Sequence, residues 1–247
     1  MTDAVDGHGL LAGKRVLVTA AAGTGIGFAT AARCKAEGAI VVISDKHERR
    51  LGEAAERLGD VDAIPCDVTN QADVDRLFAD AGEPDILINN AGLGGMANLV
   101  DMTDDQWAIV LDVTLNGTFR CTRAALQMMQ PRGSGVIVNN ASVLGWRAQA
   151  GQAHYAAAKA GVMALTRCAA VEAAPFGVRV NAVAPSLAMH ENLSKVMDAA
   201  ELAELERREA FGRSATPDEV AKVMVFLASD YSSYLTGEVV SVSSQHP

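Results

Sequence analysis

Seven short apolar runs, rich in β-branched residues, recur along this chain, and helical patterns are interleaved with them. Runs that are apolar throughout are typical of strands in a parallel sheet whose two faces are covered by helices. Because β-α-β crossovers are right-handed, this alternation predicts an α/β fold with a seven-stranded, doubly wound parallel sheet. The expected strands are 15–20, 40–45, 61–65, 85–89, 135–141, 178–184 and 238–242, and the expected helices are 25–37, 47–58, 70–81, 104–129, 153–174 and 217–229.

The same rhythm runs over the whole chain, so we expect residues 1–247 to form one domain. Residues 1–12 precede the first strand and are expected to be a loose tail. Residues 187–213 depart from the rhythm and carry several apolar side chains, among them Met189, Leu193 and Leu202. An insertion beside the carboxyl edge of a sheet is a candidate substrate lid, and the alternative is that its methionines pack against the core.

Composition narrows the class of partner. The 21 basic and 30 acidic residues give a formal charge of −9, which argues against nucleic acid and favours a small-molecule substrate. No apolar stretch has the length of a membrane span, and the first residues lack the pattern of a signal peptide. Four dispersed cysteines have no metal-ligand spacing, so we expect no metal site, and buried thiols fit a reducing, cytoplasmic location. These cysteines are Cys34, Cys66, Cys121 and Cys168.

A glycine-rich turn, Gly23-Thr24-Gly25-Ile26-Gly27, joins the first strand to the first helix. Missing side chains there let a pyrophosphate approach the N–H groups at the positive end of a helix. Asp45, at the tip of the second strand, can accept hydrogen bonds from adenosine ribose hydroxyls and would repel a 2′-phosphate. This favours NAD over NADP as the cofactor. The counterargument is the run of basic residues after Asp45, which can neutralise a phosphate: Lys46, His47, Arg49 and Arg50.

Tyr155 and Lys159 are four residues apart in a predicted helix and therefore share one face. The pKa of a phenol must fall by roughly three units, about 4 kcal/mol, for it to act as a base near neutrality, and nearby positive charge favours that fall. Ser142 closes the strand at 135–141 and can point to the same volume above the sheet edge, where it would hold a substrate oxygen. The structural alternatives are a solvated helix face for the Tyr-Lys pair and a turn or helix cap for the serine.

Together these features resemble the short-chain dehydrogenase/reductase family, which has a Rossmann fold, from Lys14 to about Val242. The resemblance identifies Ser142, Tyr155 and Lys159 with its catalytic residues. It also implies that Lys159 binds the nicotinamide ribose and that the charged nicotinamide supplies the second cation beside the phenol. The resemblance assigns these residues to cofactor binding: Gly23, Gly25, Ile26, Asp67, Val68, Asn90, Ala91, Gly92, Pro185 and Leu187.

Four departures from the family pattern affect the site. The glycine turn has Ala20 where a glycine is usual and is one residue longer. The asparagine that anchors a relay water in the family is replaced by Thr114, so we expect an altered relay. Pro185-Ser186 replaces Pro-Gly, and His190 stands where a threonine is expected. The chain ends Val242-Ser243-Ser244-Gln245-His246-Pro247, which bears on subunit contacts, although the resemblance still implies a homotetramer.

Within the family, residues 139–147 and the last residues are similar to actinobacterial dehydrogenases of steroid ring breakdown. That resemblance implies a bicyclic hydroxy acid or its CoA thioester as substrate. Arg147 is then a candidate for an acidic substrate group, and a surface salt bridge is the alternative. Two other functions stay open: an NADPH-dependent 3-oxoacyl thioester reductase and a non-catalytic dinucleotide-binding regulator. A methyl-transferring enzyme is disfavoured because methyl transfer has no need of the Tyr-Lys pair.

Overall fold

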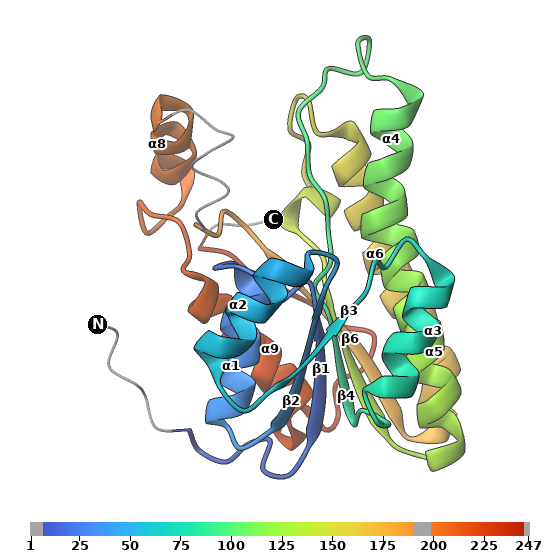
Figure 1. Ribbon diagram of the computed structural model, residues 1–247. Helices are drawn as coiled ribbons and strands as arrows, with labels where there is room; N and C mark the ends of the chain where they lie inside the picture. Colours follow the sequence, from blue (N-terminus) through green and yellow to red (C-terminus); the bar gives the residue numbers. More distant parts are fainter. Residues whose placement is uncertain (1–6, 190–198, 245–247) are drawn as a thin grey trace.

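The computed structural model describes residues 7–189 and 199–244. All seven strands are parallel and form one sheet in the order β3-β2-β1-β4-β5-β6-β7, so the strand order reverses direction between β1 and β4 (Figure 1). This confirms the predicted doubly wound α/β sheet. The strands are β1 Arg15–Thr19, β2 Ile40–Asp45, β3 Asp62–Pro65, β4 Ile86–Asn89, β5 Gly135–Asn140, β6 Val178–Pro185 and β7 Val239–Val242.

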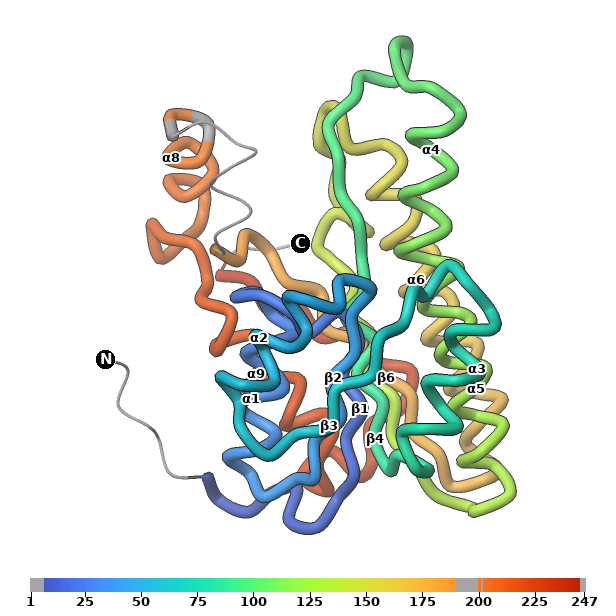
Figure 2. The backbone as a smooth tube through the Cα atoms, in the orientation of Figure 1, coloured from blue at the N-terminus to red at the C-terminus, as the bar shows by residue number. Residues whose placement is uncertain are grey.

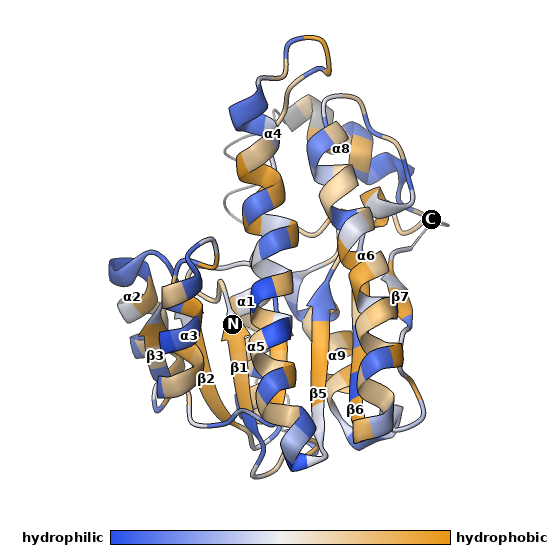
Figure 3. Cartoon of the chain, turned by 90° about the vertical axis from the view of Figure 1, so that its right-hand side faces the viewer, coloured by the Kyte–Doolittle hydropathy of each residue, from blue (hydrophilic) through white to orange (hydrophobic). Residues whose placement is uncertain are grey.

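Helices cover both faces of the sheet because successive strand residues point to opposite sides. On one face Val16 and Val18 of β1 pack with the buried side chains of three helices, α1 Ile26–Ala36, α2 Glu48–Leu58 and α9 Pro217–Ala228. On the other face Leu17 packs with α3 Gln71–Asp80, α5 Gly117–Arg132 and α6 Ala153–Ala173. The strands are mostly apolar, whereas the covering helices carry many polar residues on their outer surfaces (Figure 3).

A wide helical turn interrupts the helix predicted over 104–129. The chain forms α4 over Asp104–Leu111, then a π-helical turn over Asp112–Asn116, and then α5. Such turns take in an extra residue and often occur at functional sites. Periodicity did not reveal it, because apolar residues continue on both sides. The tube in Figure 2 shows α4 extending beyond the sheet edge at which β1 and β4 end, as does α8, Ala199–Arg208, on the other side.

A ladder of buried amides ties the two central strands to their helices. The Asn89 Nδ2 donates to Thr122 Oγ1 of α5 at 3.0 Å and to Asn139 Oδ1 of β5 at 2.9 Å. The Asn139 Nδ2 in turn donates to Thr166 Oγ1 of α6 at 2.9 Å. Since Asn89 and Asn139 are paired residues in adjacent strands, a slip in register would leave these buried groups unpaired. The ladder therefore fixes the strands that lead into the site.

Two expectations about the chain's periphery need correction. The described part of the predicted loose tail is anchored: Leu11 is buried, and its N–H donates to the Glu37 carbonyl at 3.1 Å. Of the four cysteines, Cys168 is exposed, because it lies on the outer side of α6. The predicted lid at 187–213 falls partly outside the described residues, with His190 and Leu193 among those left out. Its described part comprises an isolated bridge between Ala188 and Ala215 and the helix α8.

Candidate active site

The carboxyl ends of β1, β4, β5 and β6 meet at one edge of the sheet and bring most of the predicted site residues together. The glycine turn follows β1, Asn90 to Gly92 follow β4, and Ser142 follows β5. In open α/β sheets, ligands bind at this edge where the strand order reverses, which here is between β1 and β4. The site lies where the fold class places it.

Gly27 is required by the close approach of α1 to the end of β1. A Cβ atom on this residue would lie 2.4 Å from both the Ala20 carbonyl oxygen and the Asn90 Nδ2. The Asn90 Nδ2 donates to the carbonyls of Thr19 at 3.3 Å and Ala20 at 3.0 Å, which locks the turn to β4. Ala20, standing where the family has glycine, has a φ of 51°. This left-handed conformation costs an alanine roughly 1–2 kcal/mol, so the longer turn is strained at its first residue.

The start of α1 presents unused donors. Among the described residues, the backbone N–H groups of Ile26, Gly27 and Phe28 have no hydrogen-bond acceptor, and the first helical bond runs from Ala29 to Gly25 at 3.1 Å. Such amides, at the positive end of a helix, suit an anion such as a pyrophosphate.

Asp45 lies at the end of β2, next to the same turn. Its carboxylate accepts hydrogen bonds from the His47 N–H at 3.0 Å and from the Ala22 N–H. Burial raises the pKa of Asp45 above its ordinary value, and the positive charges of Arg50 and Lys46 oppose that rise. The Asp45 carboxylate is thus held beside the glycine turn, and the basic residues Lys46 and Arg50 are close to it. The choice between NAD and NADP depends on the balance between this carboxylate and these positive charges.

Asp67 and Val68 follow β3 as predicted. The Asp67 Oδ1 accepts hydrogen bonds from the N–H of Thr69 at 3.0 Å and from its hydroxyl at 2.8 Å. Val68 is buried against Gly117, where a Cβ would lie 2.6 Å from the Val68 Cγ2. These contacts fix the conformation of the Asp67-Val68 segment, which follows β3 at the same edge of the sheet as the glycine turn.

Ser142, Tyr155 and Lys159 converge at the end of β5 and the start of α6. The Ser142 hydroxyl accepts a hydrogen bond from the Leu144 N–H at 3.2 Å, so it also caps the short helix Val143–Gly145. The Lys159 Nζ lies 5.5 Å from the centre of the Tyr155 ring and donates to the Asn140 carbonyl. Lys159 is only 3% exposed. The pair therefore does not form the solvated helix face that was the alternative.

Burial dominates the electrostatics of this cluster in the protein by itself. Burial raises the pKa of Tyr155 from 10.0 to about 12, and a hydrogen bond with Ser142 opposes the rise. Burial lowers the pKa of Lys159 from 10.5 to about 7. The expected fall in the pKa of Tyr155 is therefore not found here, because desolvation of the charged phenolate outweighs the hydrogen bond with Ser142. A further positive charge is needed before the phenol can act as a base.

The shifted pKa of Lys159 gives a prediction for stability. Between about pH 7 and 8.5 the unfolded chain keeps the lysine proton while the folded protein loses it, since the pKa falls from 10.5 to about 7 on folding. The free energy of unfolding should therefore rise with pH in this window, by up to about 1.4 kcal/mol per pH unit. Urea titrations of the ligand-free protein measure the slope.

The control is Lys159→Met, which should give a flat profile over the same window. The window ends below pH 9 because burial also raises the pKa of the Cys34 and Cys66 thiols from 9.0 to about 12, which acts in the opposite direction. Equal slopes for the two proteins would show that Lys159 is not the group responsible.

Thr114 lies at the middle of the π-helical turn and is fully buried. Its hydroxyl accepts from the Leu93 N–H at 3.0 Å and donates to the Leu93 carbonyl at 3.2 Å. This ties the turn to the segment after β4. Asn116 is exposed and donates to Asp112 at 3.0 Å, as expected for a residue on the other side of the helix. A part for Thr114 in a proton relay stays a prediction.

Asn140 is a site residue that the sequence reasoning missed. Its Nδ2 donates to the Asn90 Oδ1 at 3.0 Å, and its carbonyl holds Lys159, so it links the lysine to the glycine turn. Its Oδ1 is buried without a hydrogen-bond partner among the described residues. An unpaired buried acceptor calls for a donor. The sequence did contain a signal for this residue, because Asn140 is a polar residue at the end of a mostly apolar strand.

Comparison with known proteins decides the family. The sequence model of the family described as enoyl-(acyl carrier protein) reductase matches residues 20–244. The chain is a short-chain dehydrogenase/reductase. It is 63% identical to the (5R,7aS)-5-hydroxy-7a-methyl-1-oxo-2,3,5,6,7,7a-hexahydro-1H-indene-carboxyl-CoA reductase of Mycobacterium tuberculosis, over 98% of this chain and 97% of that one.

Two further relatives give the breadth of the family. The 3-oxoacyl-[acyl-carrier-protein] reductase of Thermotoga maritima is 39% identical over 94% of this chain and 97% of its own. The crystal structure of a short chain dehydrogenase from Mycobacterium smegmatis is 59% identical, with a TM-score of 0.87 and coverage of 98% and 97%. This short-chain dehydrogenase/reductase is therefore an oxidoreductase that uses a nicotinamide dinucleotide.

The residues present fit such a cofactor. The free amides of α1 and the open space at Gly23 suit a pyrophosphate, and the unpaired Asn140 Oδ1 offers an acceptor beside Lys159. A Cβ on Gly92 would lie 3.4 Å from the Lys159 Nζ, so the backbone lies close to the lysine there. Pro185 is buried at the end of β6, and the Leu187 carbonyl accepts from the Ala215 N–H at 2.8 Å. Pro185 and Leu187 thus lie at the carboxyl edge of the sheet, and β4 and β5 separate them from the glycine turn that follows β1.

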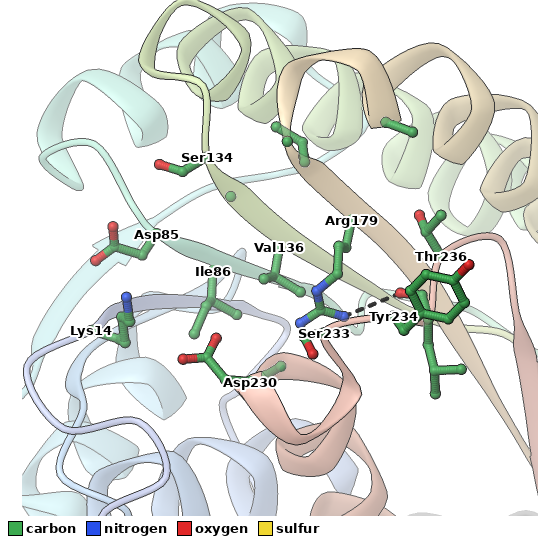
Figure 4. A pocket seen from close by; sticks show the side chains of 16 residues that line it. Lys14, Asp85, Ile86, Ser134, Val136, Arg179, Asp230, Ser233, Tyr234 and Thr236 are labelled. Carbon is green, nitrogen blue, oxygen red and sulfur yellow. Dashed lines mark hydrogen bonds between the residues drawn. The ribbon is translucent and has the colours of Figure 1, made fainter.

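A hollow at the opposite, amino edge of the sheet is a separate feature of this short-chain dehydrogenase/reductase (Figure 4). Its Arg179 donates to oxygens of Ser232, Leu235, Leu227 and Ser229 and so has little capacity left for a ligand. Over residues 7–189 and 199–244, no helix is long and apolar enough to cross a membrane, and no cluster of metal-ligating side chains occurs.

Proposed function

We propose that this protein transfers hydride between NAD(H) and a secondary alcohol or ketone, with Tyr155 as the proton-transfer residue. The observation that carries the proposal is the convergence of Ser142, Tyr155 and Lys159 beside the glycine turn at one sheet edge. A regulator without turnover would have no chemical need for this set. The cofactor supplies or accepts the hydride when it is bound.

The side chains divide the remaining work. Ser142 donates a hydrogen bond to the substrate oxygen, and the Tyr155 hydroxyl moves the proton on that oxygen. With a pKa of about 12, the phenol is protonated at neutral pH and suited to donate its proton in the direction of ketone reduction. In the direction of oxidation it has to accept a proton, which positive charge at Lys159 and on the cofactor would favour. Lys159 is positioned for this by the Asn140 carbonyl.

The proposed substrate is a bicyclic, steroid-derived hydroxy acid or its CoA thioester. Support comes from the named substrate of the 63% identical relative, together with the near-complete coverage of both chains. Arg147 lies five residues after Ser142 and is a candidate for an acidic substrate group. The alternative is reduction of a 3-oxoacyl thioester with NADPH, favoured by the 39% identical relative that carries that activity in its name.

The experiment is turnover followed at 340 nm with two substrate sets, each with NAD(H) and NADP(H). One set holds a bicyclic indane-type hydroxy acid and its CoA thioester, and the other a 3-oxoacyl thioester and a simple cyclic alcohol. The proposal expects the highest kcat/KM with the bicyclic thioester and NAD(H). A higher value for the 3-oxoacyl thioester with NADPH would establish the alternative, and no turnover despite dinucleotide binding would favour the regulator.

Cofactor choice gives a separate prediction. The wild type should bind NADH more tightly than NADPH, because the Asp45 carboxylate would repel a 2′-phosphate. Asp45→Ala should weaken NADH binding about tenfold, the effect of losing one charge-assisted hydrogen bond, and should narrow or reverse the preference. Parallel calorimetric titrations of both proteins with both dinucleotides measure this. Tighter binding of NADPH by the wild type would contradict the role given to Asp45.

A homotetramer and a cytoplasmic location remain proposals from the family resemblance. Exposed aromatic side chains on α4 and α5 support self-association, since Trp107 is 38% and Phe119 is 42% exposed. Light scattering coupled to size-exclusion chromatography would measure the mass in solution. A monomer at micromolar concentration would contradict the proposed tetramer.

A further inference from the structure

Arg57 is a charged residue beside the glycine turn, and no carboxylate in the described part of the chain pairs with it. It lies in the last turn of α2, and its guanidinium carbon is 4.1 Å from the centre of the Phe28 ring of α1. Its Nη1 donates to the Gly23 carbonyl at 3.0 Å. Among the described residues it has no ion pair. A positive charge is thus held against the glycine turn by two contacts.

The hydrogen bond sets the direction of a peptide group in that turn. In a trans peptide the C=O and the following N–H point in opposite directions. With the Gly23 carbonyl turned to Arg57, the Thr24 N–H points away from α2. Gly23 has a φ of 115°, a value that glycine reaches readily and other residues rarely do. The glycine therefore permits the orientation, and Arg57 selects it.

The same contact removes a competing acceptor from the start of α1. The Gly23 carbonyl is four residues before the Gly27 N–H, which is the offset of a helical hydrogen bond. The Gly23 carbonyl accepts from Arg57 instead, and the Gly27 N–H, like those of Ile26 and Phe28 in the same first turn, has no acceptor among the described residues. An anion at the turn then finds the amide available. The turn is one residue longer than the family pattern and therefore has more conformational freedom. The hydrogen bond from Arg57 to Gly23 limits that freedom.

We propose that Arg57 is a positioning residue for the dinucleotide. It holds the Gly23 carbonyl away from α1, which keeps the amides of the first turn open, and its unneutralised charge attracts the phosphates. The proposal rests on the proposed binding of the dinucleotide at this turn. Arg57 does not touch the reacting atoms, so it should affect the dissociation constant of the dinucleotide and leave kcat at saturation unchanged.

The test is calorimetric titration with NADH of the wild type, Arg57→Ala, Arg57→Gln and a control. The control is Arg49→Ala, which removes the same charge from the exposed surface of the same helix, where Arg49 pairs with Glu53; NADH has no 2′-phosphate that Arg49 could neutralise. We expect the Kd to rise about tenfold for Arg57→Ala and to change less than about twofold for Arg49→Ala. Arg57→Gln keeps an N–H donor for Gly23 without the charge, so its Kd should be intermediate at low salt and close to wild type at high salt.

An unchanged Kd for Arg57→Ala would overturn the proposal, and so would equal losses in the Arg57 and Arg49 variants, since the effect would then be net charge alone. If Arg57→Ala does not fold, as a thermal melt without ligand would show, Arg57→Gln decides: a wild-type Kd at low salt overturns the proposal. A wild-type protein that does not bind NADH would instead contradict the proposed function, so the two failures are distinguishable.

Discussion

Tyr155→Phe is expected to lower kcat by about 10²–10⁴-fold, the range for loss of a positioned proton-transfer group. The hydroxyl is the only difference between the two side chains, so packing of the ring near Gly94 and Lys159 should persist. The Kd of NADH should therefore stay within about threefold of wild type, since a positioned proton-transfer group acts mainly on the transition state. Stopped-flow or steady-state absorbance at 340 nm, with titration calorimetry on the same samples, separates the two quantities.

The matched control is Tyr231→Phe, which removes the same hydroxyl from a residue that is 76% exposed and far from the sheet edge of the site. Its kcat should equal that of the wild type. If the Tyr155 variant also turned over at the wild-type rate, the proton-transfer role would belong to another group. Ser142→Ala would then have to be tested next, because Ser142 contributes the other hydroxyl of the cluster.

Gly27→Ala should have the second large effect. Its Cβ would meet the Ala20 carbonyl oxygen and the Asn90 Nδ2 at 2.4 Å, and the backbone oxygen cannot move without shifting the turn. Overpacking of this kind costs about 1–3 kcal/mol of unfolding free energy. The shifted turn should also weaken NADH binding roughly 100-fold or more, because the amides of α1 lose their alignment. Urea unfolding and calorimetry measure the two effects.

Gly52→Ala is the internal comparison for this substitution. Gly52 lies inside α2, where an added Cβ meets nothing within 4 Å. There the change should stabilise the protein by about 0.5–1 kcal/mol, because alanine is the better helix former, and it should leave NADH binding unaltered. Similar effects of the two substitutions would show that the close approach at Gly27 is not a constraint on binding.

The strands and the cluster of Ser142, Tyr155 and Lys159 could be predicted because each leaves a local pattern. Apolar runs of fixed length predict buried strands, and the four-residue spacing of Tyr155 and Lys159 predicts a shared helix face. The glycine turn was predictable from its position between a strand and a helix. In each case the physics acts over a few residues, so the sequence alone carries the signal.

Features that depend on contacts between distant segments were not predictable in this way. The link from Arg57 to Gly23 spans 34 residues, and the buried Asn140 amide reaches Asn90 across 50. The pKa of Tyr155 was expected to fall, yet burial by surrounding segments raises it to about 12. Burial of a side chain is a property of the folded chain, and no local spacing reports it.

The π-helical turn at Asp112–Asn116 makes the length of its segment critical. It holds α4 and α5 at a fixed rotation about a common axis, and an α-helix turns by about 100° for each residue. Adding a further residue there would swing Cys121, Ala125 and Met129 of α5 away from the sheet that buries them, whereas removing one would close the segment into a regular α-helix without the widened turn. We therefore expect this stretch to tolerate exchange of its side chains more readily than any change in the number of its residues.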